Sequence, residues 1–174
     1  MSHDHLPPER EDELLSMPSR RTTLPLAAAA VAVAAVLIFV VTKEPHYNVR
    51  PGAQAGNAHC GRITENAPGK LAGHPKHAIE LAGVALWGDS NIVLRCGVAE
   101  IGPTSDPCFS AGGVDWVIDT ARSTDTQKVI ITYGRTPATE VTVTHSAKAP
   151  DEVLVELSAL IAPITQTSEC IRSE

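Results

Sequence analysis

The chain has 174 residues and carries 14 lysines and arginines against 20 aspartates and glutamates, which gives a net charge of −6. This length allows one folded domain of about 150 residues together with a short appendage. The negative charge excludes the simplest nucleic-acid-binding function, because phosphate binding requires a basic surface. The aromatic residues are too few to favour a platform for bases or sugars. They are Phe39, Tyr47, Trp87, Phe109, Trp116 and Tyr133.

A long apolar segment lies near the N-terminus. Residues 24–41 contain no charged side chain. As a helix they would extend about 27 Å, close to the thickness of the hydrocarbon core of a bilayer. Pro25 falls in the first turn, where a missing amide N–H costs little. We therefore predict a transmembrane helix over residues 24–42.

A cleaved signal peptide is the main alternative for this segment. The apolar run is longer than the roughly 7–15 residues typical of signal peptides. The A-x-A triplet at residues 53–55 also lies too far beyond the run for ordinary cleavage. A buried helix of a soluble protein seldom continues for five turns without a polar residue. The sequence thus favours an uncleaved span.

Charge and cysteine placement predict how the span is oriented. Arg10, Arg20 and Arg21 precede it, whereas Lys43 and Arg50 follow it, so the N-terminal side is expected in the cytoplasm. An even number of cysteines on one side suits an oxidising compartment. All four follow the span: Cys60, Cys96, Cys108 and Cys170. We expect a single-pass protein of the cell membrane whose C-terminal domain is extracytoplasmic.

Composition divides the chain into four parts. Residues 1–23 are rich in charges and prolines, which predicts a disordered cytoplasmic tail. Residues 24–42 form the predicted span. Prolines, glycines and small residues in 43–58 are typical of a tether. Residues 59–174 are expected to form the extracytoplasmic domain.

The domain shows signals for strands between two helices. A short helix is expected over residues 60–67, ended by Pro68, and a loop over 73–77. A mostly apolar stretch, 79–87, follows. Alternating or β-branched segments then predict four strands. These are residues 91–96, 113–119, 128–133 and 140–144.

The second helix is expected at the C-terminal end, where Asp151 can cap it and Pro163 ends it. An apolar stripe at helical spacing runs between them. It comprises Val153, Leu154, Leu157, Leu160 and Ile161. The polar spacer 120–127 allows the strands on either side of it to form a hairpin. The expected fold is α+β, an antiparallel sheet with helices on one face.

Two disulfides are the simplest use of the four cysteines. Each would stabilise the domain by roughly 3–4.5 kcal/mol in the chain-entropy model. We favour Cys60–Cys96, which ties the first helix to the first strand, together with Cys108–Cys170. The rival pairing of Cys60 with Cys170 and of Cys96 with Cys108 remains open.

Catalytic and metal-binding motifs are missing from the sequence. It contains no P-loop, GxGxxG, HExxH or GxSxG, and no C-x-x-C typical of thiol–disulfide enzymes. His74 and His77 lie on a predicted loop, and no nearby cluster completes a tetrahedral metal set. Asp115 and Asp119 are expected on a solvated strand face. We therefore expect no catalytic residue, metal or cofactor.

Four residues form a candidate surface for a ligand or partner: Trp87, Asp89, Arg95 and Trp116. The two tryptophans are also natural core residues. A small-ligand site would need an apolar pocket beside Trp87 and Trp116. An enzyme would need Asp89, Arg95 and a histidine to converge in a cleft.

Several of these motifs resemble a known family. They are W-G-D at 87–89, L-R-C-G at 94–97, G-V-x-W at 113–116 and E-V-T-V at 140–143, which follow a span and Cys60. The chain is similar here to the actinobacterial membrane-anchored proteins grouped as the domain-of-unknown-function family numbered 3515, over roughly residues 24–162. The resemblance implies a cell-envelope location and pairing of Cys60 with Cys96. It implies no activity, and the acidic tail, Cys108 and Cys170 depart from the family pattern.

We expect a non-enzymatic envelope protein that binds a partner protein or serves as an accessory subunit of a membrane complex. The small residues of Ala27–Ala35 permit close packing of the span against another helix. The alternative is a binding module for a small envelope lipid or wall ligand. An enzyme of unrecognised type is a third possibility.

Overall fold

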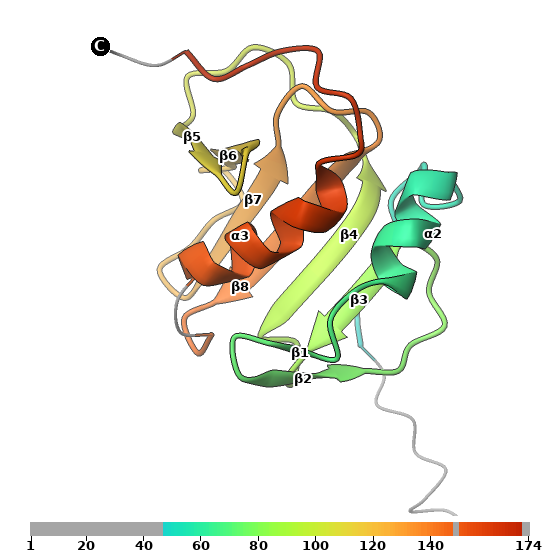
Figure 1. Cartoon of the computed structure of the whole chain (residues 1–174). Helices are drawn as coiled ribbons and strands as arrows, with labels where there is room; N and C mark the ends of the chain where they lie inside the picture. The colour runs from blue at the N-terminus through green and yellow to red at the C-terminus, as the bar shows by residue number, and fades with distance from the viewer. Residues whose placement is uncertain (1–46, 148–149, 172–174) are drawn as a thin grey trace, which may run out of the picture. The chain divides into compact units, whose positions relative to one another are not determined.

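The computed structural model of the chain describes residues 47–147 and 150–171 (Figure 1). The predicted tail, residues 1–23, and the predicted span, residues 24–42, lie outside these stretches. No helix within the two described stretches has the length and apolar character needed to cross a bilayer.

One antiparallel sheet of eight strands forms the framework of the domain (Figure 1). The strands are β1 (Lys70–Leu71), β2 (His74–His77), β3 (Val84–Trp87), β4 (Ile92–Val98), β5 (Cys108–Ala111), β6 (Val114–Ile118), β7 (Gln127–Thr132) and β8 (Ala138–Thr144). Their order is β1-β2-β3-β4-β8-β7-β6-β5. Two four-stranded meanders therefore meet where β4 pairs with β8 in the middle of the sheet.

The α+β prediction is confirmed, and so is the predicted hairpin, since Val117 of β6 pairs with Ile131 of β7. The structure has more strands than expected. The predicted loop at 73–77 contains β2, in which Lys76 pairs with Trp87 of β3. Pro75 is tolerated there because its carbonyl still accepts a hydrogen bond from Gly88 N, at 2.9 Å. Tertiary pairing thus overrides the local turn signal.

Two helices cover one face of the sheet: α2 (Ala58–Glu65) and α3 (Pro150–Ile161) (Figure 1). Asn57 caps α2 by accepting a hydrogen bond from His59 N at 2.9 Å. The predicted apolar stripe of α3 is confirmed, because Val153, Leu154, Leu157 and Ile161 are buried. These side chains pack with the inner sides of the central strands to form the main core.

Trp87 and Trp116 lie in this core and are fully buried. The indole Nε1 of Trp87 donates to Pro68 O at 2.8 Å, and that of Trp116 donates to Ser158 Oγ at 3.3 Å. Strand alternation turns both large rings toward the helices, and their polar atoms find partners there. Their prediction as surface residues is therefore wrong, and their interpretation as core residues is confirmed.

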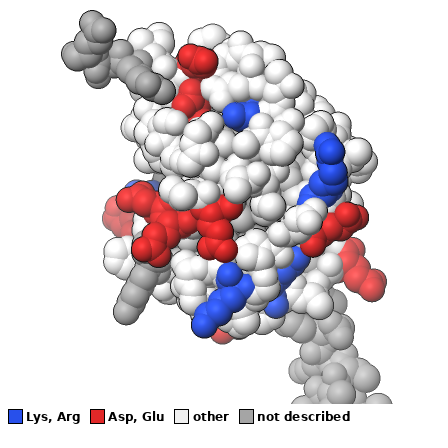
Figure 2. Space-filling model, viewed as in Figure 1, with Lys and Arg blue, Asp and Glu red and all other residues white. Residues whose placement is uncertain are grey.

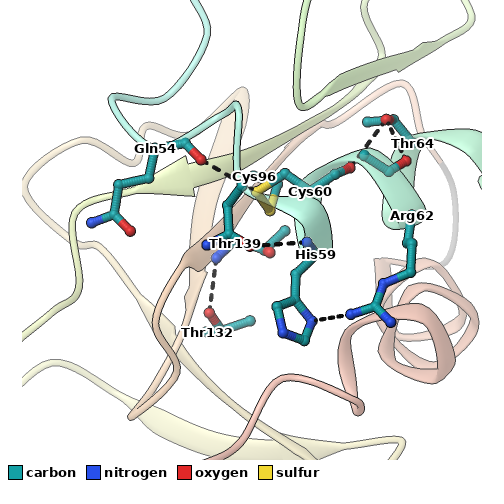
Figure 3. The surroundings of a disulfide bond; sticks show 10 residues. Gln54, His59, Cys60, Arg62, Thr64, Cys96, Thr132 and Thr139 are labelled. Atoms are coloured by element: carbon teal, nitrogen blue, oxygen red, sulfur yellow. Dashed lines mark hydrogen bonds between the residues drawn. A yellow bond between two sulfur atoms is a disulfide. The ribbon is translucent and has the colours of Figure 1, made fainter.

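The favoured disulfide pairing is confirmed, and the rival pairing is wrong. Cys60 of α2 is bonded to Cys96 of β4, with the two Cα atoms 5.3 Å apart (Figure 3). Cys108 of β5 is bonded to Cys170, with a Cα separation of 5.6 Å. The first disulfide fixes α2 on the centre of the sheet. The second holds residues 162–171, which we call the C-terminal segment, against the edge strand β5.

Residues 47–57, which we call the leading segment, are hydrogen-bonded to the domain. The tether prediction, which expected a flexible linker here, is therefore wrong for these residues. Gln54 N donates to Gly97 O at 2.9 Å, and Gly52 is buried. Arg95 Nε donates to Arg50 O at 2.7 Å. The segment crosses the end of β4, where its register shifts between Cys96 and Val98, and then leads into α2. Of the predicted tether, residues 43–46 lie outside the described stretches.

The crossing at Gly97 leaves no room for a side chain. Gly97 has φ of 85°, and a Cβ atom there would overlap the backbone of Gln54 and Ala55. We expect Gly97→Ala to lower the free energy of unfolding by about 3 kcal/mol, from the unfavourable φ and from displacement of the leading segment. Urea unfolding of the full chain in mild detergent, followed by fluorescence of the two core tryptophans, measures this.

Gly113→Ala is the matched control. Gly113 has φ of 77°, but a Cβ there meets no atom within 4 Å. The free energy of unfolding of this variant should fall by only about 1–2 kcal/mol, the cost of placing alanine in the left-handed conformation. Equal losses for the two variants would contradict a backbone-to-backbone contact at Gly97.

Candidate binding groove

The face of the sheet opposite the helices carries an open groove. Side chains alternate along each strand, so those of β4 and β8 that turn away from the core share this face. The groove encloses about 670 Å³ and is walled on one side by Asn48–Arg50 of the leading segment. A second hollow of about 280 Å³ shares Arg95, Arg122 and Glu140 with it.

A buried carboxylate organises the groove. Glu140, on the central strand β8, has a side chain only 4% exposed. Its Oε1 accepts from Arg95 Nη1 at 2.7 Å, and its Oε2 accepts from Arg122 Nη1 at 2.6 Å. Arg95 and Glu140 face each other directly across β4 and β8. Charged partners on both carboxylate oxygens offset the cost of burying this group.

Arg122 reaches the groove from the loop between β6 and β7. Its Nε donates to Asp119 Oδ2 at 2.6 Å. Burial by itself lowers the pKa of Arg122, but hydrogen bonds to Asp119 and Glu140 raise it above its ordinary value. Burial raises the pKa of Asp119, but the hydrogen bonds from the side chain and backbone of Arg122 lower it below its ordinary value. Both groups are therefore charged at neutral pH.

The two guanidinium groups keep donors for a further partner. Nη2 of Arg95 and Nη2 of Arg122 make no hydrogen bond to any described residue. Their side chains are 26% and 47% exposed. Arg50 also lines the groove, so its lining holds three arginines and one glutamate, while Asp119 pairs with Arg122 from outside the lining. A guanidinium binds carboxylates and phosphates through two parallel hydrogen bonds, so this arrangement suits an anion.

The Asp119–Arg122 pair should make stability depend on pH. Because the folded-state pKa of Asp119 is lowered, its contribution is present above the unfolded-state value near 4 and is lost as pH falls through the folded-state value. We expect Asp119→Asn to cost about 1 kcal/mol at pH 7 and progressively less below pH 4. Urea unfolding from pH 7 to pH 2.5 measures the difference.

Asp125→Asn is the control for this prediction. Asp125 lies exposed in the same loop and forms no ion pair with any residue in the described stretches. The free energy of unfolding of Asp125→Asn should equal that of the wild type at every pH. A loss for Asp119→Asn that persists at pH 2.5 would point to a contact other than the ion pair.

The four residues of the predicted surface do not come together. Arg95 lies in the groove, whereas Trp87 and Trp116 are buried on the other face. Asp89 is exposed in the turn between β3 and β4 and does not line the groove. Neither of the two hollows on this face has a histidine in its lining. Asp89, Arg95 and a histidine, which the enzyme hypothesis would require in one cleft, are therefore not brought together in either hollow.

Asp115 differs from its expected solvated position, being only 7% exposed. Its Oδ2 accepts from Gln166 Nε2 at 2.8 Å and from Cys170 N at 2.9 Å. Nearby, the buried Arg135 donates to the carbonyls of Ala162 and Ile164. The C-terminal segment thus covers one end of the sheet and removes Asp115 from solvent.

The face covered by the helices carries a cluster of acidic side chains. Figure 2 shows acidic side chains gathered on the helix-covered face, where Asp151, Glu152 and Glu156 of α3 are exposed. Lysine and arginine side chains lie elsewhere on the same face (Figure 2). Within residues 47–147 and 150–171, no group of three His, Cys, Asp or Glu residues is placed to hold a metal ion.

Comparison with known protein families shows a match over most of the chain. A family described as a protein of unknown function (DUF3515) matches residues 23–170. This range includes the predicted span and nearly all of the described domain. No curated protein and no solved structure matches the chain.

Proposed function

This chain belongs to DUF3515, a family of proteins of unknown function, and we propose that it is a single-pass protein of the cell membrane and cell envelope. The span over residues 24–42 anchors it, and the domain of residues 59–174 lies outside the cytoplasm. The apolar run and the cluster of arginines before it support this arrangement. The two disulfides support an oxidising location for the domain.

Within this location, the chain acts as a non-enzymatic interaction module, an accessory subunit of a membrane complex. The observation that carries this function is the open groove of the domain, whose side chains are arranged for holding a partner. Glu140, Arg95 and Arg122 are fixed by one another, which preorganises the surface. The small residues of the span suit packing against a partner's helix.

Affinity purification of the full chain from native membranes in mild detergent tests the subunit role. We expect a stoichiometric membrane partner with the wild type. Replacing residues 24–41 by the same number of leucines keeps an apolar span but removes its small-residue surface. This change should reduce recovery of the partner. A lone monodisperse protein in both preparations would contradict the subunit role.

A separate experiment tests location. The mature protein should retain residues 24–41, and the cysteines should resist alkylation in cells that receive no reductant. Mature protein that begins after Val41 would contradict the anchor. Free thiols at all four cysteines would contradict the oxidising compartment.

A module that binds a small envelope ligand is the second candidate function. The version with a pocket beside the tryptophans is not supported, because both rings are fully buried. The arginine-lined groove favours a different version, in which the ligand is an anion.

A further inference from the structure

We propose that the groove binds the phosphate group of an anionic lipid headgroup in the leaflet next to the domain. This inference rests on the proposed anchoring of the chain by residues 24–42. It goes further by assigning a ligand class and the residues that recognise it: Arg50, Arg95 and Arg122.

The first argument is the arrangement of donors. Glu140 holds Nη1 of Arg95 and Nη1 of Arg122 on its two oxygens, so the two guanidinium groups lie side by side. Each keeps an Nη2 without a partner among the described residues. A single phosphate, with its several acceptor oxygens, can therefore accept hydrogen bonds from both arginines. Their orientation is fixed before binding, which lowers the entropic cost.

The second argument is the composition of the groove. Thr142 and Gln127 line the groove, and they supply groups that can bond to headgroup hydroxyls. Val93 and Val129 line the same groove and offer apolar contact. A volume of about 670 Å³ is of the size that accommodates a small molecule rather than an isolated ion.

The third argument is distance from the membrane. Asn48–Arg50 form a wall of the groove, and only residues 42–46 separate the end of the apolar run from Tyr47. Fully extended, such a link reaches only about 20 Å. The leading segment is bonded to β4 at Gly97 and to Arg95, so the groove cannot move far from the end of the span.

The net charge of the part of the chain that follows the predicted span favours binding of one specific headgroup over general adsorption of the domain to the bilayer. Residues 43–174 carry 11 lysines and arginines against 15 aspartates and glutamates, a net charge of −4 that an anionic bilayer surface repels, and attraction of a polybasic kind needs clustered positive charge. Acidic side chains also cluster on part of the helix-covered face (Figure 2). An acidic segment of a partner protein would use the same arginines, but the short link to the predicted span gives lipid the advantage in local concentration.

Native mass spectrometry of the full chain in detergent tests the proposal. The probe is palmitoyl-oleoyl-phosphatidylglycerol, added with an equal amount of palmitoyl-oleoyl-phosphatidylcholine. We expect one phosphatidylglycerol to be retained in preference, with binding weakened by salt. Arg50→Gln should weaken retention about tenfold. This variant keeps the fold, because the hydrogen bond at this residue uses its backbone carbonyl.

Two further variants locate the site. Arg95→Gln combined with Glu140→Gln removes both members of an ion pair, and should also weaken retention about tenfold or more. Arg62→Gln is the matched control, since Arg62 lies on α2 and contacts His59 outside the groove. Retention unchanged in the groove variants, or weakened equally by Arg62→Gln, would overturn the assignment of the site.

Competition separates the lipid from other anions. Inorganic phosphate or an octaglutamate peptide that displaces phosphatidylglycerol at equimolar concentration would overturn the lipid as the source of the anion. Equal retention of the two lipids would overturn recognition of negative charge. Resistance of the full chain to alkaline carbonate extraction tests anchoring separately, so loss of the anchor and loss of headgroup binding give different results.

Discussion

Replacing Cys60 and Cys96 together by alanine should lower the free energy of unfolding by about 4 kcal/mol or more. The two cysteines are 36 residues apart, and in the chain-entropy model a closed loop of this length stabilises the folded state by about 4 kcal/mol. Both side chains are also fully buried between α2 and β4, so the variant loses core packing as well. Urea unfolding in detergent, followed by tryptophan fluorescence, measures the loss.

The pair Cys108 and Cys170 provides the control. It spans 62 residues, so loop entropy alone predicts a slightly larger loss than for the first disulfide. These cysteines are only half-buried, however, and they fasten an edge strand to the C-terminal segment. We therefore expect Cys108→Ala with Cys170→Ala to be the milder change. The reverse order would show that loop closure, and not packing under α2, dominates.

The elements with strong periodic patterns were predictable from the sequence. The apolar stripe of α3 and the alternation of β6 and β7 each extend over several residues, and the structure contains all three elements. β1 has two residues, and β2 reads His-Pro-Lys-His, which carries no alternation. Such short strands form because a neighbouring strand offers hydrogen bonds, and that depends on tertiary structure.

The groove was predictable only in part, because its residues come from separate regions of the chain. Alternation indicates that the side chain of Arg95 points to the other face of the sheet from those of Leu94 and Cys96. It indicates the same for Glu140 relative to Val141. Only the register of β4 on β8 shows that Arg95 and Glu140 face each other. Arg122 lies in a loop, where no periodicity exists, and its contact with Glu140 depends on the loop's conformation.

The leading segment shows the same limit. Prolines, glycines and small residues in 43–58 are typical of a flexible tether, but Gly52 of this segment has a different role, as has Gly97 of β4 opposite it. Gly52 and Gly97 lack Cβ atoms at the point where two backbones come into contact. Composition cannot separate a glycine that gives flexibility from one that permits close approach.

The second large effect is expected at Glu140, where replacement by alanine should cost about 3–5 kcal/mol. The carboxylate is 4% exposed and holds two arginines. Removing it loses two charge-assisted hydrogen bonds, each worth about 1.5–3 kcal/mol, and leaves two guanidinium groups side by side without their shared partner. Glu65→Ala, at an exposed position of α2, should change stability by less than about 0.5 kcal/mol.

A double-mutant cycle between Glu140 and Arg95 shows whether the ion pair, and not packing alone, accounts for the loss. If the pair is responsible, Glu140→Ala combined with Arg95→Ala should destabilise the chain by at least about 1 kcal/mol less than the sum of the single variants. Additive losses would mean that the two side chains stabilise the sheet independently. In that case Glu140 would not preorganise the arginines on which headgroup binding depends. If the pair is responsible, Glu140→Ala should weaken headgroup binding as well as stability.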